Sequence, residues 1–143
     1  MTYKISRCIT HNLTKIFKNA RAVFSLKAHL VWCPKYRRPV LVGKIEKRLR
    51  ELLYQTASEH EWVIEAIEIM PDHVHLFISF DPRYAVGEIV NRLKGVTSRN
   101  MRAEFRELRS RIPTLWSRSY YAGTVGHVSD ASVRKYIESQ KGK

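Results

Sequence analysis

The sequence predicts an α+β fold in which an antiparallel sheet carries helices on one face. Two kinds of pattern support this class. Several segments alternate apolar and polar residues, as half-buried strands do, and two longer segments repeat apolar residues at helical spacing. The 143 residues contain no linker rich in glycine and proline, and a chain of this length can bury one core, so we predict a single folded domain.

The first predicted strand covers residues 24–32, where every second side chain is apolar. The prolines within residues 33–39 end this strand, because a proline cannot donate a hydrogen bond to the ladder of a sheet. After Gly43 the apolar residues follow helical spacing, which predicts an amphipathic helix over residues 44–59.

Two further strands are predicted on either side of a turn at Pro71 and Asp72. Residues 61–70 are rich in β-branched side chains, which favour strands. The second strand covers residues 73–80, and its side chains should alternate between the two faces of the sheet. One face would carry His73, His75, Phe77 and Ser79, and the other Val74, Leu76, Ile78 and Phe80.

The last part of the chain predicts a long helix over residues 86–108, a strand over residues 117–125 and a terminal helix over residues 130–140. The element order is then β-α-β-β-α-β followed by one more helix. This is the split βαβ, ferredoxin-like arrangement with an additional C-terminal helix. One face of the sheet stays open for chemistry.

The net charge of +13 at pH 7 is distributed in blocks along the chain. Residues 1–21 hold five basic and no acidic side chains, and residues 91–118 hold eight basic against two acidic ones. Between these blocks, residues 51–75 hold six acidic and no basic side chains. Clustered positive charge predicts a polyanionic partner, of which nucleic acid is the commonest. The acidic segment could lie beside a bound cation or on solvated surface.

The composition also excludes several classes of protein. Hydrophobic residues make up 44% of the chain, which is too many for a disordered basic tail. No apolar run approaches the ~18 residues needed to cross a bilayer, and no signal-peptide core is recognisable, so we predict no membrane association. Cys8 and Cys33 lack the spacing of a metal or redox pair, which predicts a reducing, cytoplasmic location.

The sharpest local motif is His73-Val74-His75. In a strand, positions i and i+2 project from the same face, so both imidazoles can contact one cation while Val74 enters the core. Histidine pairs on a sheet are also common as plain polar surface, and this alternative stays open. On the terminal helix, Tyr136 and Gln140 are four residues apart and share one face. A tyrosine there is either a packing residue or a nucleophile assisted by a cation.

Five stretches together carry a resemblance to a known family. They are HLVWCPKYRRPVLVGKIEKRL (29–49), MPDHVHLFISFDP (70–82), LKGVTSRNMRAEF (93–105), PTLWSRSYYAGTVG (113–126) and SVRKYIESQ (132–140). In this order and spacing the chain resembles the small single-tyrosine HUH transposases, the TnpA type of hairpin-ended bacterial and archaeal insertion sequences, where HUH denotes His-hydrophobe-His. The resemblance extends over residues 22–140. It divides the chain into a basic N-terminal arm, residues 1–21, and a transposase domain, residues 22–143.

The resemblance implies roles for four residues. His73 and His75 would be metal ligands, with Gln140 as the third ligand. Tyr136 would attack the scissile phosphate of DNA, forming a 5′-phosphotyrosine and releasing a 3′-hydroxyl. The family's metal is Mg²⁺ or Mn²⁺, whereas imidazoles alone would have favoured zinc or another transition metal.

The family's partners follow from the same resemblance. They are single-stranded DNA with subterminal hairpins and a second copy of the chain, forming a homodimer. The tyrosine helix in the family is mobile and can complete the partner's site. Gly123 and Gly126 are suited to a hinge before that helix, and equally to an ordinary turn.

Basic residues outside the motifs are candidates for contacts to the DNA backbone. Besides the N-terminal arm, they are Lys35, Arg37, Arg38, Arg92, Arg99, Arg102 and Arg106. The last four, with Arg109, recur at helical spacing and predict a cationic stripe on the helix over residues 86–108. Trp116, Tyr120 or Tyr121 could stack on unpaired bases or pack in the core.

Two alternatives to a transposase of a mobile element stay open. A domesticated relative would use the same chemistry at repeated chromosomal palindromes. A non-catalytic ferredoxin-like module would bind single-stranded nucleic acid through its basic surface, and the two histidines would be incidental. The formation of a covalent protein–DNA adduct separates the enzyme from the binding module.

Overall fold

The computed structural model describes residues 17–18, 23–24, 26–124 and 130–143. A four-stranded antiparallel sheet lies at its centre, with the strand order β4–β5–β3–β6. Its strands are β3 (Leu26–Trp32), β4 (Val63–Met70), β5 (His73–Phe80) and β6 (Tyr121–Thr124). The short strands β1 (Phe17–Lys18) and β2 (Val23–Phe24) pair with each other. The order of the central sheet confirms the predicted ferredoxin-like arrangement.

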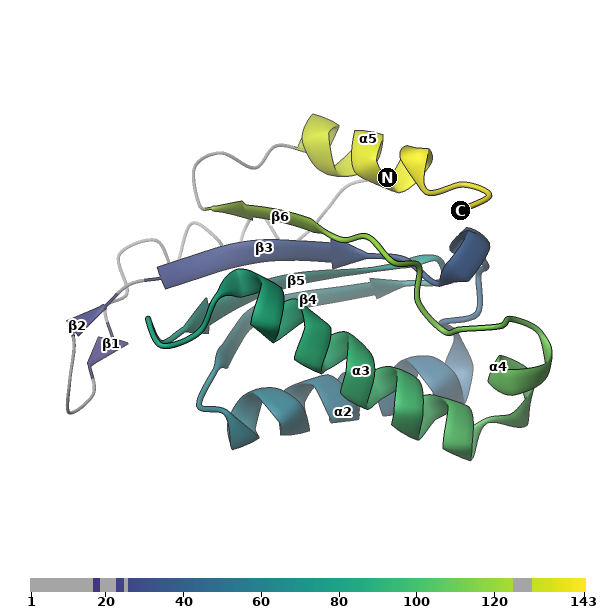
Figure 1. The fold of residues 1–143 in the computed structure, drawn as a ribbon, viewed down its shortest axis with the longest axis horizontal. Helices are drawn as coiled ribbons and strands as arrows, with labels where there is room; N and C mark the ends of the chain where they lie inside the picture. Colours follow the sequence, from purple (N-terminus) through teal and green to yellow (C-terminus); the bar gives the residue numbers. More distant parts are fainter. Residues whose placement is uncertain (1–16, 19–22, 25, 125–129) are drawn as a thin grey trace.

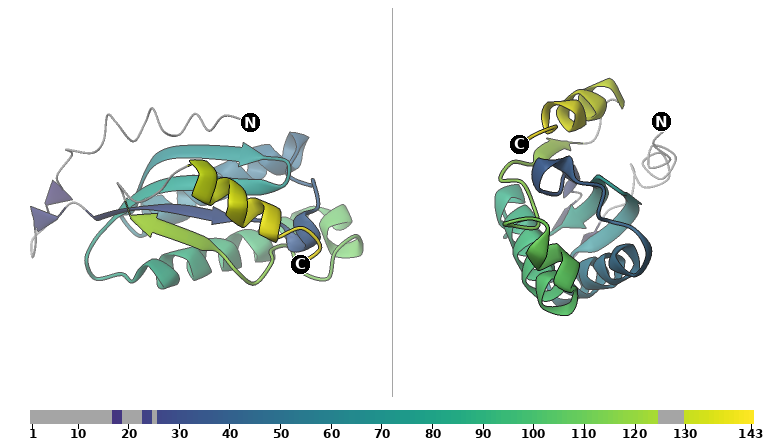
Figure 2. Two further views of the ribbon diagram at one scale, coloured as in Figure 1. Left: turned by 90° about the horizontal axis from the view of Figure 1, so that it is seen from above. Right: turned by 90° about the vertical axis from the view of Figure 1, so that its right-hand side faces the viewer.

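The helices lie on both sides of this sheet (Figure 1). Helices α2 (Gly43–Glu59) and α3 (Val86–Glu104) cover one face, as predicted for the ferredoxin-like arrangement. Helix α5 (Asp130–Ser139) lies over the opposite face, and the end-on view in Figure 2 shows the sheet between it and the other two helices. Strand β3 leads through a single turn of 3-10 helix, η1 (Lys35–Arg37), towards α2.

The hydrophobic core fills the space between the sheet and α2 with α3. Val74, Leu76 and Ile78 of β5 are fully buried there, together with Leu49 of α2 and Leu93 of α3. Buried apolar residues follow the spacing of their element. They occupy every second position in the strand and every third or fourth position in the helices. The polar side chains that alternate with them on β3 and β5 therefore face α5.

The long helix predicted over residues 86–108 is wrong in one respect. It breaks at Phe105, whose backbone is extended (φ −118°, ψ 107°), and a short helix α4 (Arg106–Ser110) follows. The break leaves helix-terminal carbonyls that need donors. Arg109 Nη1 donates to the carbonyl of Arg102 at 2.7 Å, and Arg102 Nη1 donates to that of Leu108 at 3.1 Å. Arg106 and Arg109 thus belong to a separate helix, and the predicted continuous stripe of arginines does not form.

The strand predicted over residues 117–125 is shorter than expected, because β6 begins only at Tyr121. The ammonium of Lys94 on α3 donates to the carbonyls of Ser117 at 2.7 Å, Arg118 at 3.3 Å and Ser119 at 3.2 Å. Carbonyls bound in this way are not available for a strand ladder. Gly126 and most of the basic arm, residues 1–21, lie outside the described residues.

Candidate active site

The two histidines of the predicted motif lie side by side on β5. His73 and His75 project from the same face of the sheet, opposite to the core, while Val74 between them packs against α2 and α3 side chains in the core. This is the alternation that the sequence predicts. Both imidazoles are buried, with 0% and 2% of their surface exposed. They are therefore not plain polar surface.

A carboxylate fixes the orientation of the first histidine. Nδ1 of His73 lies 2.9 Å from Oδ1 of Asp72, the residue that precedes it. Because a carboxylate only accepts hydrogen bonds, Nδ1 carries a hydrogen and donates it to Asp72. Metal-binding histidines commonly show this carboxylate–imidazole arrangement. Asp72 belongs to the acidic segment of the sequence, so part of that segment does lie at the histidines.

A third histidine, His29, contacts the second one from the neighbouring strand. Its Nδ1 lies 3.2 Å from Nε2 of His75, and its ring stacks on Phe77 with centroids 4.7 Å apart. Burial lowers the pKa of His75 to about 3 and that of His29 to about 4. Both rings are thus neutral at pH 7, which is the form that binds metal ions. Sequence alternation puts His29 on the correct face of β3, but only the strand register brings it to His75.

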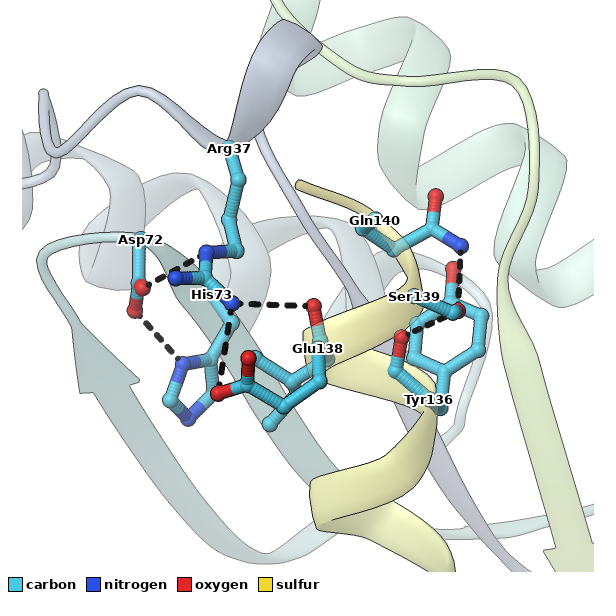
Figure 3. Close-up of polar contacts among 8 residues, drawn as sticks. Arg37, Asp72, His73, Tyr136, Glu138, Ser139 and Gln140 are labelled. Carbon is cyan, nitrogen blue, oxygen red and sulfur yellow. Dashed lines mark hydrogen bonds and ion pairs between the residues drawn. The ribbon is translucent and has the colours of Figure 1, made fainter. Parts of the chain in front are cut away.

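Arg37 connects this histidine side of the molecule to α5. Its backbone lies in the left-handed region (φ 53°), which is uncommon for a residue other than glycine. Its Nε lies 3.3 Å from Oδ2 of Asp72, and its Nη1 donates to the carbonyl of Ile137 at 3.2 Å and lies 3.6 Å from Oε1 of Glu138. Figure 3 shows the guanidinium between Asp72 and the helix. Arg37 was predicted as a DNA contact, and in this structure its side chain binds protein groups.

Tyr136 of α5 and Gln140, which directly follows the helix, lie on the same side of it, as their spacing predicts, and both contact Ser119. The phenol oxygen of Tyr136 lies 2.9 Å from Ser119 Oγ, and Gln140 Oε1 accepts a hydrogen bond from the same hydroxyl at 2.9 Å. The Tyr136 ring also packs on Tyr121, with centroids 6.0 Å apart. Burial raises the pKa of Tyr136 to about 12. In this position the phenol is protonated at neutral pH and is a poor nucleophile.

The predicted four-residue site is therefore divided into two pairs. In Figure 3, Arg37, Asp72 and His73 lie on one side of α5, while Tyr136 and Gln140 lie on the other side. The reason is the way in which the helix docks. Ile137 is buried with 4% of its surface exposed, and Arg37 holds the histidine side of the same turn, so Tyr136 is turned towards β6.

The other predicted DNA contacts lie in several places. Arg92 and Arg99 are exposed on α3, on the opposite side of the sheet from the histidines, and Arg106 is exposed on α4. Arg102 caps the end of α4, as described above. Arg38 is exposed just after η1, and Lys35 lines a pocket beside Tyr136.

Of the three aromatic residues proposed for base stacking, Trp116 belongs to the core. It is 6% exposed, its indole N–H donates to Thr97 Oγ1 at 3.0 Å, and its ring meets Trp32 edge-on. Tyr120 is 36% exposed. Tyr121 is half-buried beside the ring of Tyr136.

Within one chain, the side chains at this site provide only some of the ligands that a divalent ion needs. Over the described ranges, no three His, Cys, Asp or Glu side chains converge as a metal centre would require. His73 and His75 supply two buried imidazoles. An amide oxygen such as that of Gln140 would have to come from a different position of the helix.

The sequence that carries this site matches a known protein family. Residues 22–140 match the model of the family described as IS200-like transposases. The chain belongs to the IS200-like transposase family. The matched segment contains the histidine motif, the tyrosine helix and all the strands of the central sheet.

Two curated relatives agree with this membership. The chain is 39% identical to the ISDra2 transposase TnpA of Deinococcus radiodurans over 123 residues, which cover 85% of this chain and 88% of the relative. It is 30% identical to the transposase for insertion sequence element IS200 of Salmonella typhimurium, again over 123 residues, covering 85% of this chain and 80% of the relative.

Two solved structures share the fold of this IS200-like transposase. A crystal structure of a candidate transposase from Deinococcus radiodurans superimposes with a TM-score of 0.82 at 33% identity, covering 89% of this chain and 99% of that one. A REP-associated tyrosine transposase bound to a REP hairpin gives a TM-score of 0.54 at 11% identity, covering 85% of this chain and 68% of that one, and shares the fold alone. Within the described part of this chain, no helix is both long enough and apolar enough to cross a membrane.

Proposed function

We propose that this transposase cuts and rejoins single-stranded DNA at hairpin-bearing ends of an insertion sequence, through a covalent 5′-phosphotyrosine on Tyr136. The observation that carries the proposal is the pair of buried imidazoles, His73 and His75, on the face of the sheet that is crossed by a helix bearing a tyrosine. Family membership supports DNA transposition. The REP-associated relative with its bound hairpin supports a hairpin as the substrate feature.

A divalent ion, Mg²⁺ or Mn²⁺, would be held by His73, His75 and Gln140. Asp72 supports this assignment, because a carboxylate that accepts a hydrogen bond from Nδ1 commonly orients a metal-binding imidazole. When bound, the ion would supply charge neutralisation at the scissile phosphate.

The chain's own residues divide the remaining work. The oxygen of Tyr136 attacks the phosphorus, and its bond to phosphorus forms as the bond to the 3′-oxygen breaks. The phenol proton is lost to solvent, and the leaving 3′-oxygen takes up a proton from solvent to become the 3′-hydroxyl. The oxygen of Tyr136 must leave Ser119 to attack, because there it lies on the other side of α5 from His73. The new ester retains the energy of the phosphodiester, so a 3′-hydroxyl can reverse the step and join strands without ATP.

A homodimer is part of the proposal. Since α5 separates Tyr136 from His73 within one chain, the helix must either move or serve the histidines of a partner subunit. The basic residues Arg38, Arg92 and Arg99 are exposed and remain candidates for backbone phosphates of the DNA.

The central experiment is covalent capture. Wild-type protein incubated with hairpin-bearing single-stranded DNA and Mg²⁺ should give an adduct detectable by mass, and Tyr136→Phe should give none. Tyr121→Phe is the matched control, since Tyr121 is the neighbouring phenol, and it should form the adduct. An adduct that persists in Tyr136→Phe would contradict the assignment of the nucleophile.

Mixing inactive variants tests the dimer. If α5 serves the partner's histidines, then His73→Ala mixed with Tyr136→Phe should regain cleavage in the heterodimer, up to about half the sites. If the two variants stay inactive together while the wild-type protein cleaves, then helix and histidines of one chain act together.

A further inference from the structure

A pocket beside Tyr136 is the most distinctive feature outside the histidine side of the molecule. It has a volume of about 350 Å³, and three cationic residues line it: Lys35, Arg118 and Lys143. The phenol of Tyr136 and the amide of Gln140 form another part of its lining. No carboxylate side chain belongs to the lining residues. We call this cavity the tyrosine pocket.

We propose that the tyrosine pocket binds the phosphate that Tyr136 carries after cleavage, and so holds the covalent intermediate away from the histidines. The inference rests on the proposed function, because it concerns the phosphotyrosine of that reaction. The ligand is a phosphodiester with one negative charge, joined to the protein through the oxygen of Tyr136.

The walls of the tyrosine pocket are fixed by backbone hydrogen bonds. The amide of Lys35 donates to the carbonyl of Leu115 at 2.9 Å, and the amide of Ser117 donates to that of Cys33 at 3.0 Å. The ammonium of Lys94 on α3 also donates hydrogen bonds to the carbonyls of Ser117 and Ser119. The site exists before any phosphate enters it, and a preformed site loses little entropy on binding.

The chemistry of the lining matches a phosphate on Tyr136. Ser119 Oγ lies 2.9 Å from the phenol oxygen and donates its hydrogen to Gln140 Oε1, so it can donate to an ester on Tyr136 once it turns away from that acceptor. Ser117 lines the same pocket and offers a second hydroxyl. Cationic donors bind phosphate more strongly than neutral ones, and guanidinium groups bind it in a bidentate way. The pocket therefore offers charge and donors where the new ester would lie.

The position of the tyrosine pocket affects whether the covalent intermediate is reversed before a strand is exchanged. Exchange of one phosphate ester for another is close to balanced in free energy, so modest binding of the ester shifts the equilibrium. With the phosphate in the tyrosine pocket, on the other side of α5 from His73, the intermediate is removed from the groups that catalyse its reversal. A strand can then be exchanged before rejoining.

A binding experiment without metal tests the pocket independently of catalysis. Tyr136→Phe protein in EDTA is titrated with one single-stranded oligonucleotide in two forms, 5′-phosphorylated and 5′-hydroxyl. The 5′-phosphate should bind about three- to tenfold more tightly, the range of one or two charge-assisted contacts. Arg118→Gln or Lys35→Gln in the same background should remove that gain. Lys47→Gln, which removes an exposed cation from α2 on the opposite face, should retain it.

Two results would overturn the proposal. One is equal affinity for the two oligonucleotides. The other is an equal loss of affinity for both of them in Arg118→Gln, which would assign this cation to backbone phosphates of a bound strand.

The covalent reaction supplies the second readout. With a fixed concentration of the released 3′-hydroxyl strand, the equilibrium fraction of adduct should fall about three- to tenfold in Arg118→Gln and stay unchanged in Lys47→Gln. An unchanged fraction in Arg118→Gln contradicts the pocket's role. Absence of adduct in the wild-type protein instead contradicts the proposed function, and the binding experiment still decides whether the pocket takes a 5′-phosphate.

Discussion

The two sides of helix α5 are built in different ways. On the histidine side, His73 and His75 belong to β5, whose hydrogen bonds to β3 and β4 fix their register. On the tyrosine side, Tyr136 and Gln140 lie at the C-terminal end of α5. This end is held by the buried side chain of Ile137, by Arg37, and by hydrogen bonds from the hydroxyls of Ser117 and Ser119 to Gln140. The first pair is a property of the sheet. The second depends on where one helix rests.

This difference separates the proposed metal ligands from the proposed nucleophile. A one-residue slip of β5 would place both histidines in the core, so the register of the sheet protects their arrangement. A change in the position of α5 needs only the loss of a few polar contacts and one buried isoleucine. The geometry thus allows Tyr136 to change place while His73 and His75 stay still.

The largest expected effect comes from removing a fixed ligand. His73→Ala should lower cleavage by at least about a hundredfold, because the charge neutralisation expected at this site is worth several kcal/mol. Binding of hairpin DNA, measured by fluorescence anisotropy, should change by less than about twofold. His60→Gln is the control, since His60 stacks on Trp62 away from the site. Cleavage at the wild-type rate in His73→Ala would contradict the metal assignment.

The next effect concerns the carboxylate behind His73. Asp72→Asn keeps the shape of the side chain but offers a weaker acceptor to Nδ1, so Mn²⁺ should bind about 10- to 100-fold more weakly. Titration with Mn²⁺ followed by electron paramagnetic resonance measures this directly. Glu51→Gln removes an acidic group from α2 on the other face of the sheet, and its Mn²⁺ affinity should equal that of the wild type. Equal affinity in Asp72→Asn would exclude a role for Asp72 at the metal.

The tyrosine side can be tested by loosening the helix. Ile137→Ala removes the buried contact of α5, and amide hydrogens of residues 134–140 should exchange about tenfold faster or more, since truncating a buried isoleucine costs about 2 kcal/mol or more. Amides of β3 and β5 should exchange as in the wild type. Lys135→Ala, on the exposed part of the same helix, should leave the exchange unchanged. Unchanged protection in Ile137→Ala would show that other contacts hold the helix.

The smallest expected effect is a change in the free energy of unfolding with pH. Burial lowers the pKa of His29 and His75 below 6.5, so as the pH falls from about 6.5 to about 4 the unfolded chain binds protons that the folded chain does not. The free energy of unfolding of the metal-free protein should then decrease, by up to about 1.4 kcal/mol per pH unit for each histidine. Urea unfolding at several pH values measures the slope. His75→Asn should reduce the slope, and an identical slope would contradict the burial argument.

The sequence predicts the histidine side well because the pattern there is local. The alternation along residues 73–80 is enough to place Val74 in the core and both imidazoles on the open face. The same holds for the shared face of Tyr136 and Gln140. Each inference needs only the repeat of one element.

Relations between elements are what the sequence does not reveal. Residues far apart along the chain, Asp72 and Ile137, share the guanidinium of Arg37, and no periodicity indicates this. The break at Phe105 was missed because Leu108, which is buried, continues the apolar spacing of the helix before it. The contact of His29 with His75 depends on the register between strands, which the alternation of one strand cannot give.

The ammonium of Lys94 connects α3 to residues 117–119 by hydrogen bonds. It stands on α3, whose outer surface carries Arg92 and Arg99, and it grips three consecutive carbonyls of the chain that supports Tyr136 and Gln140. The same segment is also tied to α3 through Trp116, whose indole N–H donates to Thr97 Oγ1 at 3.0 Å. Residues 117–119 are thus held by α3 on one side and contact Tyr136 and Gln140 on the other, so the resting position of α5 depends on a helix of the opposite face.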